Sequence, residues 1–353
     1  MKILFDHSIF LHQKVGGISK YIVKLNENLN KREKISKIFC PISINYYLKN
    51  TNVEKDNLLY ISKIPLFSRK LIFFINNFLT LIYFYIYKPN FIHLSYYNNF
   101  YNFFKIPYVL TVYDLTHEKT KRLTQNLDKK KVIFNAKKIF CISNNTKKDL
   151  IKYYNIKSSK IRVTYLGIEQ NTFHKLRKKK YLLFVGSRSS YKNLHNLLVA
   201  FSKSIYLKKN YKLIVFGDRN FTDDEIFLLN KLKINKKVIF KTGNDQDLKK
   251  YYTNASLFVF PSKYEGFGLP LLEAMRFGCS VVCSNIAVFK EVAGNSCFYF
   301  NPNNAINIKT TLERALKSHS LRRKKIKQGF QQIKKFTWKK TAVNTYKEYK
   351  III

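Results

Sequence analysis

The chain has 353 residues, enough for two domains that each bury a core of their own. Hydrophobic residues make up 46% and charged residues 24%, a balance that excludes an intrinsically disordered chain. Lys and Arg number 65 against 21 Asp and Glu, so the formal net charge is +44. This charge predicts attraction to nucleic acid, an anionic membrane surface or a phosphorylated substrate. Genome bias is an alternative source of the lysines, because Lys, Asn, Ile, Tyr and Phe share A/T-rich codons.

The cysteines and histidines indicate neither a disulfide framework nor a metal site. No C-x-x-C pair occurs, and the histidines lack metal-ligand spacing. Scattered cysteines are typical of a reduced compartment, and Asp6 and His7 follow Met1–Phe5 too closely for a signal peptide. We therefore expect a cytoplasmic protein without a bound metal. The cysteines are Cys40, Cys141, Cys279, Cys283 and Cys297.

Short apolar runs alternate with helical patterns along most of the chain. The first run, Lys2–Phe5, precedes a Gly16–Gly17 turn and a helix with Ile18, Ile22, Leu25 and Leu29 on one face. This alternation indicates βαβ units and parallel sheets. The other predicted strands are Tyr108–Val112, Ile139–Ile142, Ile161–Tyr165, Leu182–Val185, Leu213–Phe216, Val238–Phe240, Leu257–Phe260 and Val281–Cys283. Predicted helices between them include Leu194–Ser204, Asp245–Asn254 and Pro270–Phe277.

The most apolar run is Leu71–Tyr87, which has basic residues on both sides. It is slightly short for a membrane span, and Asn76, Asn77 and Thr80 interrupt it. We therefore expect a buried helix or a helix that lies on a membrane, with a span as the alternative.

The alternation restarts once, after Gly167, where a polar and basic stretch precedes a new strand. This pattern predicts two doubly wound domains and a linker. The tail, Trp338–Lys350, is predicted to be a polar helix with Val343, Tyr346 and Tyr349 on one stripe. The predicted divisions are an N-terminal domain at 1–168, a linker at 169–180, a C-terminal domain at 181–336, and a helix at 337–353 that can cross back to the N-terminal domain.

The sequence EGFGLPLLEAMRFG at 265–278 follows a predicted strand. Pro270 suits the first position of a helix, and Gly266 and Gly268 let backbone approach a ligand closely. The amide end of that helix favours an anion. Glu265 and Glu273 are placed to accept hydrogen bonds from hydroxyl groups, so a ligand with phosphates and sugar hydroxyls fits.

These residues resemble a known family. Glu265-x7-Glu273 within EGFGLPLLEA is similar to the signature of glycosyltransferase family 4 (group 1), and the similarity continues through FGCSVVCS at 277–284. It implies the α/β GT-B architecture, two Rossmann-like doubly wound domains facing a central cleft. The family more often has Pro at the positions of Ser280 and Lys290, a departure that we expect to alter turn rigidity rather than chemistry.

A second motif, FVGSRSSYKNL at 184–194, carries two cations. Arg188 and Lys192 lie at the mouth of a predicted strand, where α/β sheets bind ligands, and a guanidinium with an ammonium suits a diphosphate. The resemblance implies that both bind the diphosphate of the donor, and the YKN variant is similar to the mannosyl- and rhamnosyltransferase-like subgroup. The alternative for Lys192 is an ordinary solvated lysine.

The N-terminal half carries less specific similarities. Gly16 and Gly17 resemble the family's Gly-rich loop, which passes close to the donor phosphates and the acceptor. Asp114 and His117 lie in VYDLTHE, which resembles the segment that contacts the transferred sugar or the acceptor; an ordinary loop histidine is the alternative for His117. In Cys141–Leu150, Ser143 and Thr146 are expected to cap a helix rather than bind a ligand.

The resemblance implies a retaining, metal-independent hexosyltransferase in surface polysaccharide or lipopolysaccharide synthesis. Its donor is a nucleotide-diphospho-sugar similar to GDP-mannose, used as a co-substrate with no cofactor, and its expected acceptor is a lipid-linked saccharide. Glu273 accepts the ribose hydroxyls and Glu265 a ring hydroxyl of the sugar. The backbone at Gly266, Phe267, Gly268 and Leu269 contacts the diphosphate.

A lipid-linked acceptor gives the surplus positive charge a purpose, because an anionic membrane surface attracts Lys and Arg. We therefore expect a peripheral protein on the inner face of the cell membrane. The main alternative is a basic nucleic-acid-binding protein, although no recognisable binding module is present and no nucleic-acid partner is expected. A GT-B sugar-nucleotide epimerase or phosphorylase is a further alternative, against which the EGFGLP segment argues.

Overall fold

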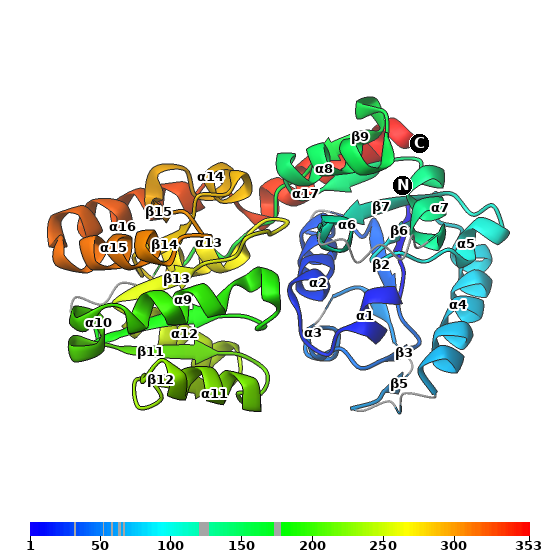
Figure 1. The fold of residues 1–353 in the computed structure, drawn as a ribbon. Coiled ribbons are helices and arrows are strands. Elements are labelled where there is room, and N and C mark those ends of the chain that lie inside the picture. The colour runs from blue at the N-terminus through cyan, green and yellow to red at the C-terminus, as the bar shows by residue number, and fades with distance from the viewer. Residues whose placement is uncertain are drawn as a thin grey trace. The chain divides into compact units, whose positions relative to one another are not determined.

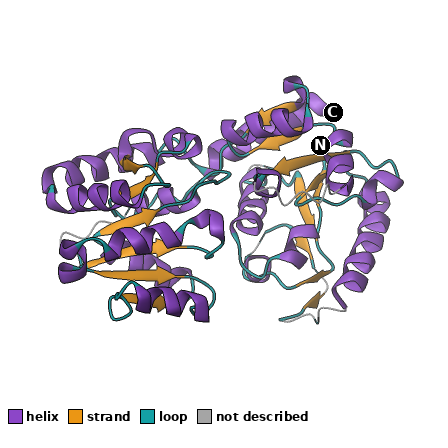
Figure 2. Cartoon of the chain, viewed as in Figure 1, coloured by secondary structure: helices purple, strands orange, loops and turns teal. Residues whose placement is uncertain are grey.

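The computed structural model describes the chain except for residues 32, 52, 58, 63–64, 66–67, 120–126 and 173–177. Its contacts divide the chain into unit 1, Met1–Gly167 with Phe336–Ile353, and unit 2, Ile168–Lys335. Each unit is a parallel sheet with helices packed on it (Figure 1, Figure 2). The division falls one residue from the predicted end of the first domain. The predicted linker at 169–180 belongs to unit 2, and its residues 173–177 lie outside the described part of the chain.

The main sheet of unit 1 has the strand order β4-β2-β1-β6-β7-β8-β9, with every neighbouring pair parallel. A parallel sheet needs apolar cover on both faces, and β1, β6 and β7 are buried throughout. A separate parallel pair joins β3 to β5. The strands of unit 1 are β1 (Ile3–Phe5), β2 (Ser36–Phe39), β3 (Ile42–Ser43), β4 (Lys55–Asp56), β5 (Leu59–Tyr60), β6 (Phe91–Leu94), β7 (Tyr108–Val112), β8 (Ile139–Cys141) and β9 (Ile161–Val163).

The helices of unit 1 connect these strands and include the C-terminal helix, which packs against α2. They are α1 (Ser8–His12), α2 (Gly17–Leu29), α3 (Tyr46–Lys49), α4 (Ser68–Tyr87), α5 (Phe100–Phe103), α6 (Thr116–Lys119), α7 (Leu127–Asn135), α8 (Asn144–Tyr154), the 3₁₀ turn η1 (Ser158–Lys160) and α17 (Trp338–Ile352). The predicted face of α2 is confirmed for Ile22, Leu25 and Leu29, which are buried, whereas Ile18 is only half-buried.

The sheet of unit 2 has the order β12-β11-β10-β13-β14-β15, again with all neighbours parallel. Because β10 and β13 are adjacent, the loops that follow them emerge at the same edge of the sheet. This edge positions the candidate site. The strands are β10 (Tyr181–Val185), β11 (Lys212–Phe216), β12 (Val238–Lys241), β13 (Leu257–Phe260), β14 (Val281–Ser284) and β15 (Cys297–Phe300).

The helices of unit 2 agree with the predicted ones to within two residues at each end where a prediction was made. Asn244 caps α12 with its side chain, which explains why that helix begins at Asp245 as predicted. The helices are the 3₁₀ turn η2 (Ser190–Lys192), α9 (Leu194–Ser202), α10 (Ile205–Asn210), α11 (Asp223–Lys231), α12 (Asp245–Asn254), α13 (Leu269–Arg276), α14 (Ala287–Ala293), the 3₁₀ turn η3 (Gly294–Ser296), α15 (Ala305–Lys317) and α16 (His319–Ile333).

The predicted stripe of the C-terminal helix is wrong in part. Tyr349 is fully buried in α17, but Val343 is 44% exposed. Thr341 and Thr345 are buried instead, because each hydroxyl donates to the carbonyl four residues earlier and so satisfies its own polar group. The buried face of α17 therefore includes polar residues, which a prediction from apolar side chains alone does not identify.

Candidate functional site

The loop after β13 leads into the start of α13. Gly268 has φ +99°, a left-handed conformation that glycine adopts without strain, and a Cβ there would lie 3.0 Å from the ring of Phe289. Gly266 and Phe267 are buried in the same loop, and Leu269 opens the helix. Pro270 follows as the sequence predicts. The amide end of α13 therefore lies directly after β13, and its dipole favours an anion.

Lys192 and Glu265 form an ion pair beside this helix start. The Lys192 Nζ and a Glu265 carboxylate oxygen are 2.7 Å apart, with side chains only 15% and 13% exposed. The ammonium also lies over the ring of Phe260, 5.4 Å from its centroid. Lys192 is thus no ordinary solvated lysine, and the structure brings together the cation predicted for the diphosphate and the carboxylate predicted for the sugar.

Arg188 follows the same strand, β10, but contacts a different carboxylate. Its Nε donates to Glu225 of α11 at 2.7 Å, and its guanidinium also donates to the carbonyls of Arg219 at 2.8 Å and Asn220 at 2.5 Å. The side chain is 1% exposed. Arg188 is therefore held toward the loop after β11, whereas Lys192 is held toward the loop after β13. Sequence reasoning missed Glu225, although its place in a Thr-x-x-Glu capping box marked it as a fixed carboxylate.

Glu273 lies in the middle of α13 and is half-buried. The hydroxyl of the buried Tyr252, from α12, donates to it at 3.3 Å. Burial, followed by the negative charge of Glu273, raises the pKa of Tyr252 well above its usual range, so the phenol keeps its proton. Tyr252 fixes the carboxylate without neutralising it, which leaves Glu273 able to accept hydrogen bonds from ligand hydroxyls. Nothing in the local sequence pattern distinguished Tyr252 from its neighbours.

Asn193 ties three loops together at this edge. It has φ +61°, a left-handed conformation that asparagine tolerates better than most residues. Its amide donates to the carbonyls of Pro261 at 3.0 Å and Pro302 at 2.8 Å. The loops after β10, β13 and β15 are therefore joined through one side chain next to Lys192.

In unit 1, the predicted glycines form the turn that begins α2. The carbonyl of Gly16 accepts hydrogen bonds from the Ser19 hydroxyl at 3.0 Å and the Lys20 amide at 3.1 Å. A Cβ on Gly16 would lie 2.3 Å from the end of the Gln13 side chain, which would have to move to admit it. Gly17 is the first residue of the helix.

The other predicted residues of unit 1 follow β7 and β8. The carboxylate of Asp114 accepts from the Thr116 amide at 2.9 Å and so caps α6, on which His117 is exposed. After β8, Ser143 accepts from the Thr146 amide at 3.0 Å, which confirms the predicted capping role for Ser143 but not for Thr146, which lies inside α8. The structure gives Asp114 a capping contact and leaves the roles predicted for Asp114 and His117 toward a sugar or acceptor as predictions.

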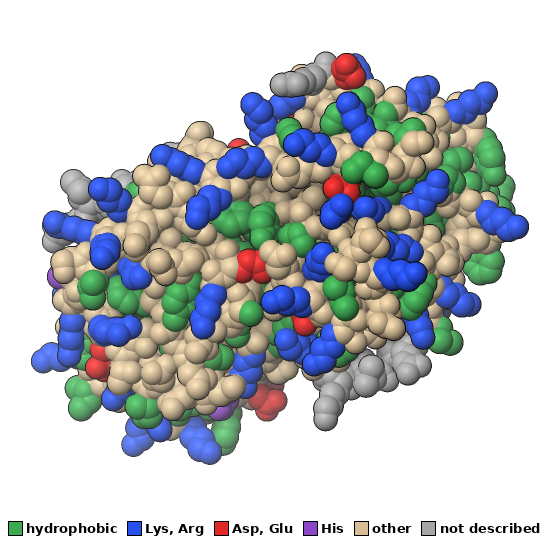
Figure 3. All heavy atoms as spheres, turned by 90° about the horizontal axis from the view of Figure 1, so that it is seen from above, with side chains coloured by type: hydrophobic (Ala, Val, Ile, Leu, Met, Phe, Trp, Pro, Cys, Tyr) green, Lys and Arg blue, Asp and Glu red, His purple; other side chains and the backbone are tan. Residues whose placement is uncertain are grey.

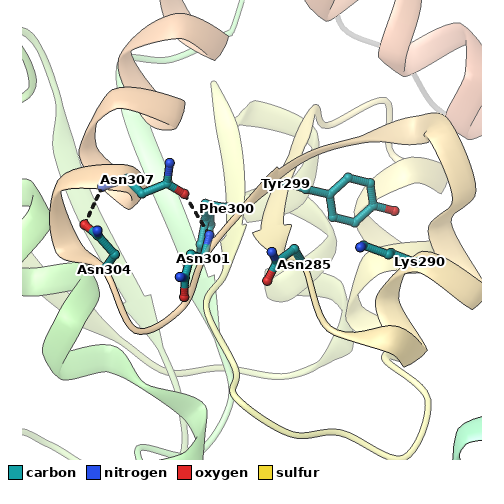
Figure 4. A pocket seen from close by; sticks show the side chains of 7 residues that line it. All are labelled: Asn285, Lys290, Tyr299, Phe300, Asn301, Asn304 and Asn307. Atoms are coloured by element: carbon teal, nitrogen blue, oxygen red, sulfur yellow. Dashed lines mark hydrogen bonds between the residues drawn. The ribbon is translucent and has the colours of Figure 1, made fainter.

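A hollow of about 500 Å³ lies at the ends of β14 and β15 and contains none of the predicted site residues. Figure 4 shows Asn301, Asn304 and Asn307 on one side, Lys290 and Tyr299 on the other, and Asn285 between them. Two hydrogen bonds connect Asn301, Asn304 and Asn307. The lining residues are Asn285, Lys290, Tyr299, Phe300, Asn301, Asn304 and Asn307.

No group of three or more His, Cys, Asp or Glu side chains in the described ranges could hold a metal ion. The carboxylates of the candidate site instead contact an ammonium, a phenol and a guanidinium. That the reaction proceeds without a bound metal stays a prediction.

Two family models match the chain, one after the other. Residues 15–171 match the model for Glycosyltransferase Family 4, and residues 168–332 match the model for Glycosyl transferases group 1. Among curated proteins, the chain is similar to O-antigen chain mannosyltransferase B of Escherichia coli, with 30% identity over 66% of this chain and 64% of that protein. It is also 32% identical to O-antigen chain mannosyltransferase RfbU of Salmonella typhimurium, over 47% of both chains. The chain thus spans less than two thirds of the length of these relatives.

The fold has close counterparts among solved structures. HepE from Anabaena, solved in complex with UDP and glucose, superposes with a TM-score of 0.80 at 14% identity, covering 99% of each chain. At this identity the likeness concerns the fold. The structure and its neighbours confirm the predicted architecture, a GT-B fold built from two Rossmann-like domains.

Proposed function

Because the chain belongs to glycosyltransferase family 4 (group 1), we propose that it transfers a hexose from a nucleotide-diphospho-sugar to a saccharide acceptor. The proposed donor is GDP-mannose and the proposed acceptor is lipid-linked, in the synthesis of lipopolysaccharide or another surface polysaccharide. The curated relatives are named as mannosyltransferases, which supports mannose as the transferred sugar. Their names also refer to the O-antigen chain, which supports a role in the synthesis of a surface polysaccharide.

The observation that carries the proposal is the ion pair between Lys192 and Glu265 at the start of α13. A nucleotide-diphospho-sugar has two features, an anionic diphosphate and neutral hydroxyls, and this edge of unit 2 offers a partner for each. The helix start and Lys192 suit the diphosphate. Glu265 suits a hydroxyl of the transferred sugar, and Glu273, held by Tyr252, suits the ribose hydroxyls.

In the proposed reaction the bond between the anomeric carbon and the diphosphate oxygen breaks, and the nucleoside diphosphate leaves with the electron pair. Lys192 and the amide end of α13 stabilise the charge that builds on that oxygen. The acceptor oxygen then bonds to the anomeric carbon from the same face, and its proton passes to the departing phosphate. This order retains the anomeric configuration and needs no metal. Unit 1 supplies the acceptor contacts, with Asp114 and His117 as candidates.

A lipid-linked acceptor requires the protein to work at a membrane surface. We propose a peripheral location on the cytoplasmic face, where the net charge of +44 favours anionic lipids. The alternative of a nucleic-acid-binding protein predicts salt-dependent binding to duplex without any affinity for sugar nucleotides.

The first test is a thermal-shift screen of the purified protein against GDP-, UDP- and dTDP-sugars. A donor at 100 times its Kd adds about 2.7 kcal/mol to stability, which gives a clear shift. We expect GDP-mannose to give the largest shift. Stabilisation by none of the sugar nucleotides would overturn the proposal, and selective stabilisation by another would replace the donor.

The second test addresses the site and the chemistry. We expect Glu273→Ala to weaken donor binding at least tenfold, because the ribose hydroxyls lose a fixed acceptor, whereas the exposed Asp224→Ala leaves it unchanged. The proton NMR spectrum of the product should show the anomeric configuration of the donor. Turnover should persist in EDTA. An inverted product, or activity restored only by a divalent cation, would refute the retaining or the metal-independent mechanism respectively.

A further inference from the structure

Helix α4 presents an apolar face to solvent. Its outward residues recur at intervals of three and four, which places them on one stripe of the helix. Such a contiguous exposed apolar stripe marks an interaction surface. Its members, with exposed fractions from 36% to 71%, are Leu71, Phe74, Ile75, Phe78, Ile82, Tyr85 and Ile86.

The opposite face of α4 packs on unit 1 and holds three buried polar residues, Asn76, Asn77 and Thr80, beside the buried Leu81. Asn76 is fully buried and exchanges two hydrogen bonds with the backbone of Ile42, at 3.1 and 2.8 Å. Asn77 accepts from the amide of Asn98 at 2.8 Å, and the hydroxyl of the buried Thr80 donates to the Asn76 carbonyl. The bonds of Asn76 and Asn77 fix α4 to the rest of unit 1 through these asparagines, while the apolar stripe faces outward.

Two further apolar side chains extend this surface. Phe103 is 77% exposed and Phe104 45%, at the end of α5, which begins two residues after Asn98. We call the exposed stripe of α4 together with Phe103 and Phe104 the apolar surface of unit 1. In Figure 3, hydrophobic side chains gather at the right-hand edge of the view, where α4 and α5 lie in Figure 1, with Lys and Arg among them.

Every charged residue in the stretch of chain that holds α4 and α5 is basic, while Asp56 and Asp128, from outside this stretch, accept hydrogen bonds from Tyr83 and Asn99. No Asp or Glu occurs between Asp56 and Asp114, a stretch that contains all of α4 and α5. Exposed basic residues stand at both ends of α4 and after α5: Arg69, Lys70, Lys88 and Lys105. A second copy of this chain docked here would bring like charges together, whereas an anionic surface would be attracted.

We propose that the apolar surface of unit 1 inserts into one leaflet of an anionic lipid bilayer, with α4 lying in the plane of the interface. Among the described residues, α4 is long and apolar enough to cross a membrane. It lies rather than spans because crossing would break the bonds of Asn76 and Asn77 and place those amides in hydrocarbon. The basic residues at its ends then contact lipid phosphates. Insertion needs neither donor nor acceptor, so it can hold where the proposed function fails.

Vesicle flotation of the full chain tests the surface. We expect binding to phosphatidylcholine vesicles that contain phosphatidylglycerol, and weaker binding at high salt. The triple variant Phe74→Gln, Phe78→Gln, Ile82→Gln should bind at least tenfold more weakly, because three inserted side chains are lost. The matched control Ile205→Gln, Ile226→Gln, Phe227→Gln removes three exposed apolar side chains from unit 2 and should bind like the wild type.

Flotation of the α4 variant at the wild-type level would overturn the proposal, as would an equal loss in the control variant. So would dimerisation of the wild type in lipid-free sedimentation that the α4 variant abolishes, because the surface would then bind a second copy. Donor binding by thermal shift should be unchanged in the α4 variant, which separates this inference from the proposed function.

Insertion depth distinguishes a lying helix from a spanning one. Phe74 and Tyr85 are both 59% exposed on the same stripe and eleven residues apart. We expect Phe74→Trp and Tyr85→Trp to be quenched equally by lipids brominated at a given depth, after subtraction of the wild-type signal from Trp338. A spanning helix would separate them by about 16 Å in depth and give unequal quenching. Unequal quenching, or none in either variant, would refute the lying helix, and Phe227→Trp should stay unquenched.

Discussion

The two units place their polar groups differently. Unit 1 buries ionisable side chains within its fold: Asp6, His7 and His93 are fully buried, and Lys129 is 9% exposed. Among the described residues of unit 2, the polar ones that are buried as a whole are uncharged: Asn193, Thr311 and several serines. Two ion pairs of unit 2 join segments that follow different strands: Arg188, whose side chain is 1% exposed, pairs with Glu225, and Lys192, 15% exposed, pairs with Glu265. This contrast predicts that the Lys192–Glu265 pair serves the chemistry, whereas the buried charges of unit 1 serve its stability.

The largest expected effect tests the role of Lys192 at the edge of the sheet of unit 2. We expect Lys192→Ala to lower turnover about 10²–10³-fold, roughly 3–4 kcal/mol, because the leaving diphosphate loses a preorganised cation. Steady-state kinetics with saturating donor measures it. Lys263→Ala is the matched control, since Lys263 is an exposed lysine in the loop that carries Glu265. Wild-type turnover in Lys192→Ala would show that this edge does not serve the chemistry.

The next effect concerns a buried charge in unit 1. Glu118 pairs with Lys129 at 2.7 Å, with both side chains 11% exposed, and accepts from Tyr154 at 2.5 Å. Burial opposes the ionisation of Glu118. The hydrogen bonds from Lys129 and Tyr154 outweigh this effect, so the pKa of Glu118 lies below its usual range. We expect Glu118→Gln to cost roughly 3 kcal/mol of unfolding free energy, because the buried ammonium of Lys129 loses the carboxylate charge that compensates it.

Unit 1 has its own reporter for this measurement. Trp338 is the only tryptophan of the chain, is 7% exposed and belongs to unit 1, so its fluorescence in a denaturant titration follows that unit. The control Glu54→Gln removes a carboxylate that is 33% exposed and paired with an exposed lysine, and should cost under about 1 kcal/mol. Equal losses in the two variants would contradict the distinction between buried and exposed charges.

The sequence predicted unit 2 more completely than unit 1, and particular residues explain why. In unit 2 the turn, helix start and carboxylates predicted for the site lie within one continuous segment, 261–273, so the local sequence context and its resemblance to the family could indicate them. The partner of Arg188 could not be read in this way, because Glu225 is 37 residues away and on another strand's loop. Strand β15 (CFYF) was also missed, although it is a continuous apolar run like the predicted β13 (LFVF).

In unit 1, β2 and β6 were missed because a polar residue interrupts each run. His93 sits in the middle of β6 and looks like a break, yet Tyr349, from the far end of the chain, hydrogen-bonds to its ring. The orientation of α4 could not be predicted for the same reason, because its polar residues also have partners far away in the sequence. Its asparagines interrupt an apolar run, and only their partners, the backbone of Ile42 and the amide of Asn98, reveal that the polar side faces inward. Long-range pairing of polar groups leaves no periodicity in the sequence.

The smallest effect isolates one buried histidine of unit 1. His93 is fully buried, with Thr111 at 2.8 Å from its Nε2, and burial lowers its pKa to about 3 from an ordinary value of 6.5. Below pH 6.5 His93 becomes protonated in the unfolded chain. In the folded chain it stays neutral until the pH approaches 3. Stability from this group is therefore complete above pH 6.5 and declines by about 1.4 kcal/mol for each pH unit below it.

We therefore expect the stability advantage of the wild type over His93→Gln, followed through Trp338, to shrink by about 2 kcal/mol between pH 7 and pH 5. The comparison removes the opposing contribution of Asp6, whose pKa is raised by burial, because Asp6 is present in both proteins. A constant difference between wild type and His93→Gln would mean that the ring is protonated in the folded chain, and unit 1 would then hold a buried cation stabilised by its hydroxyl partners.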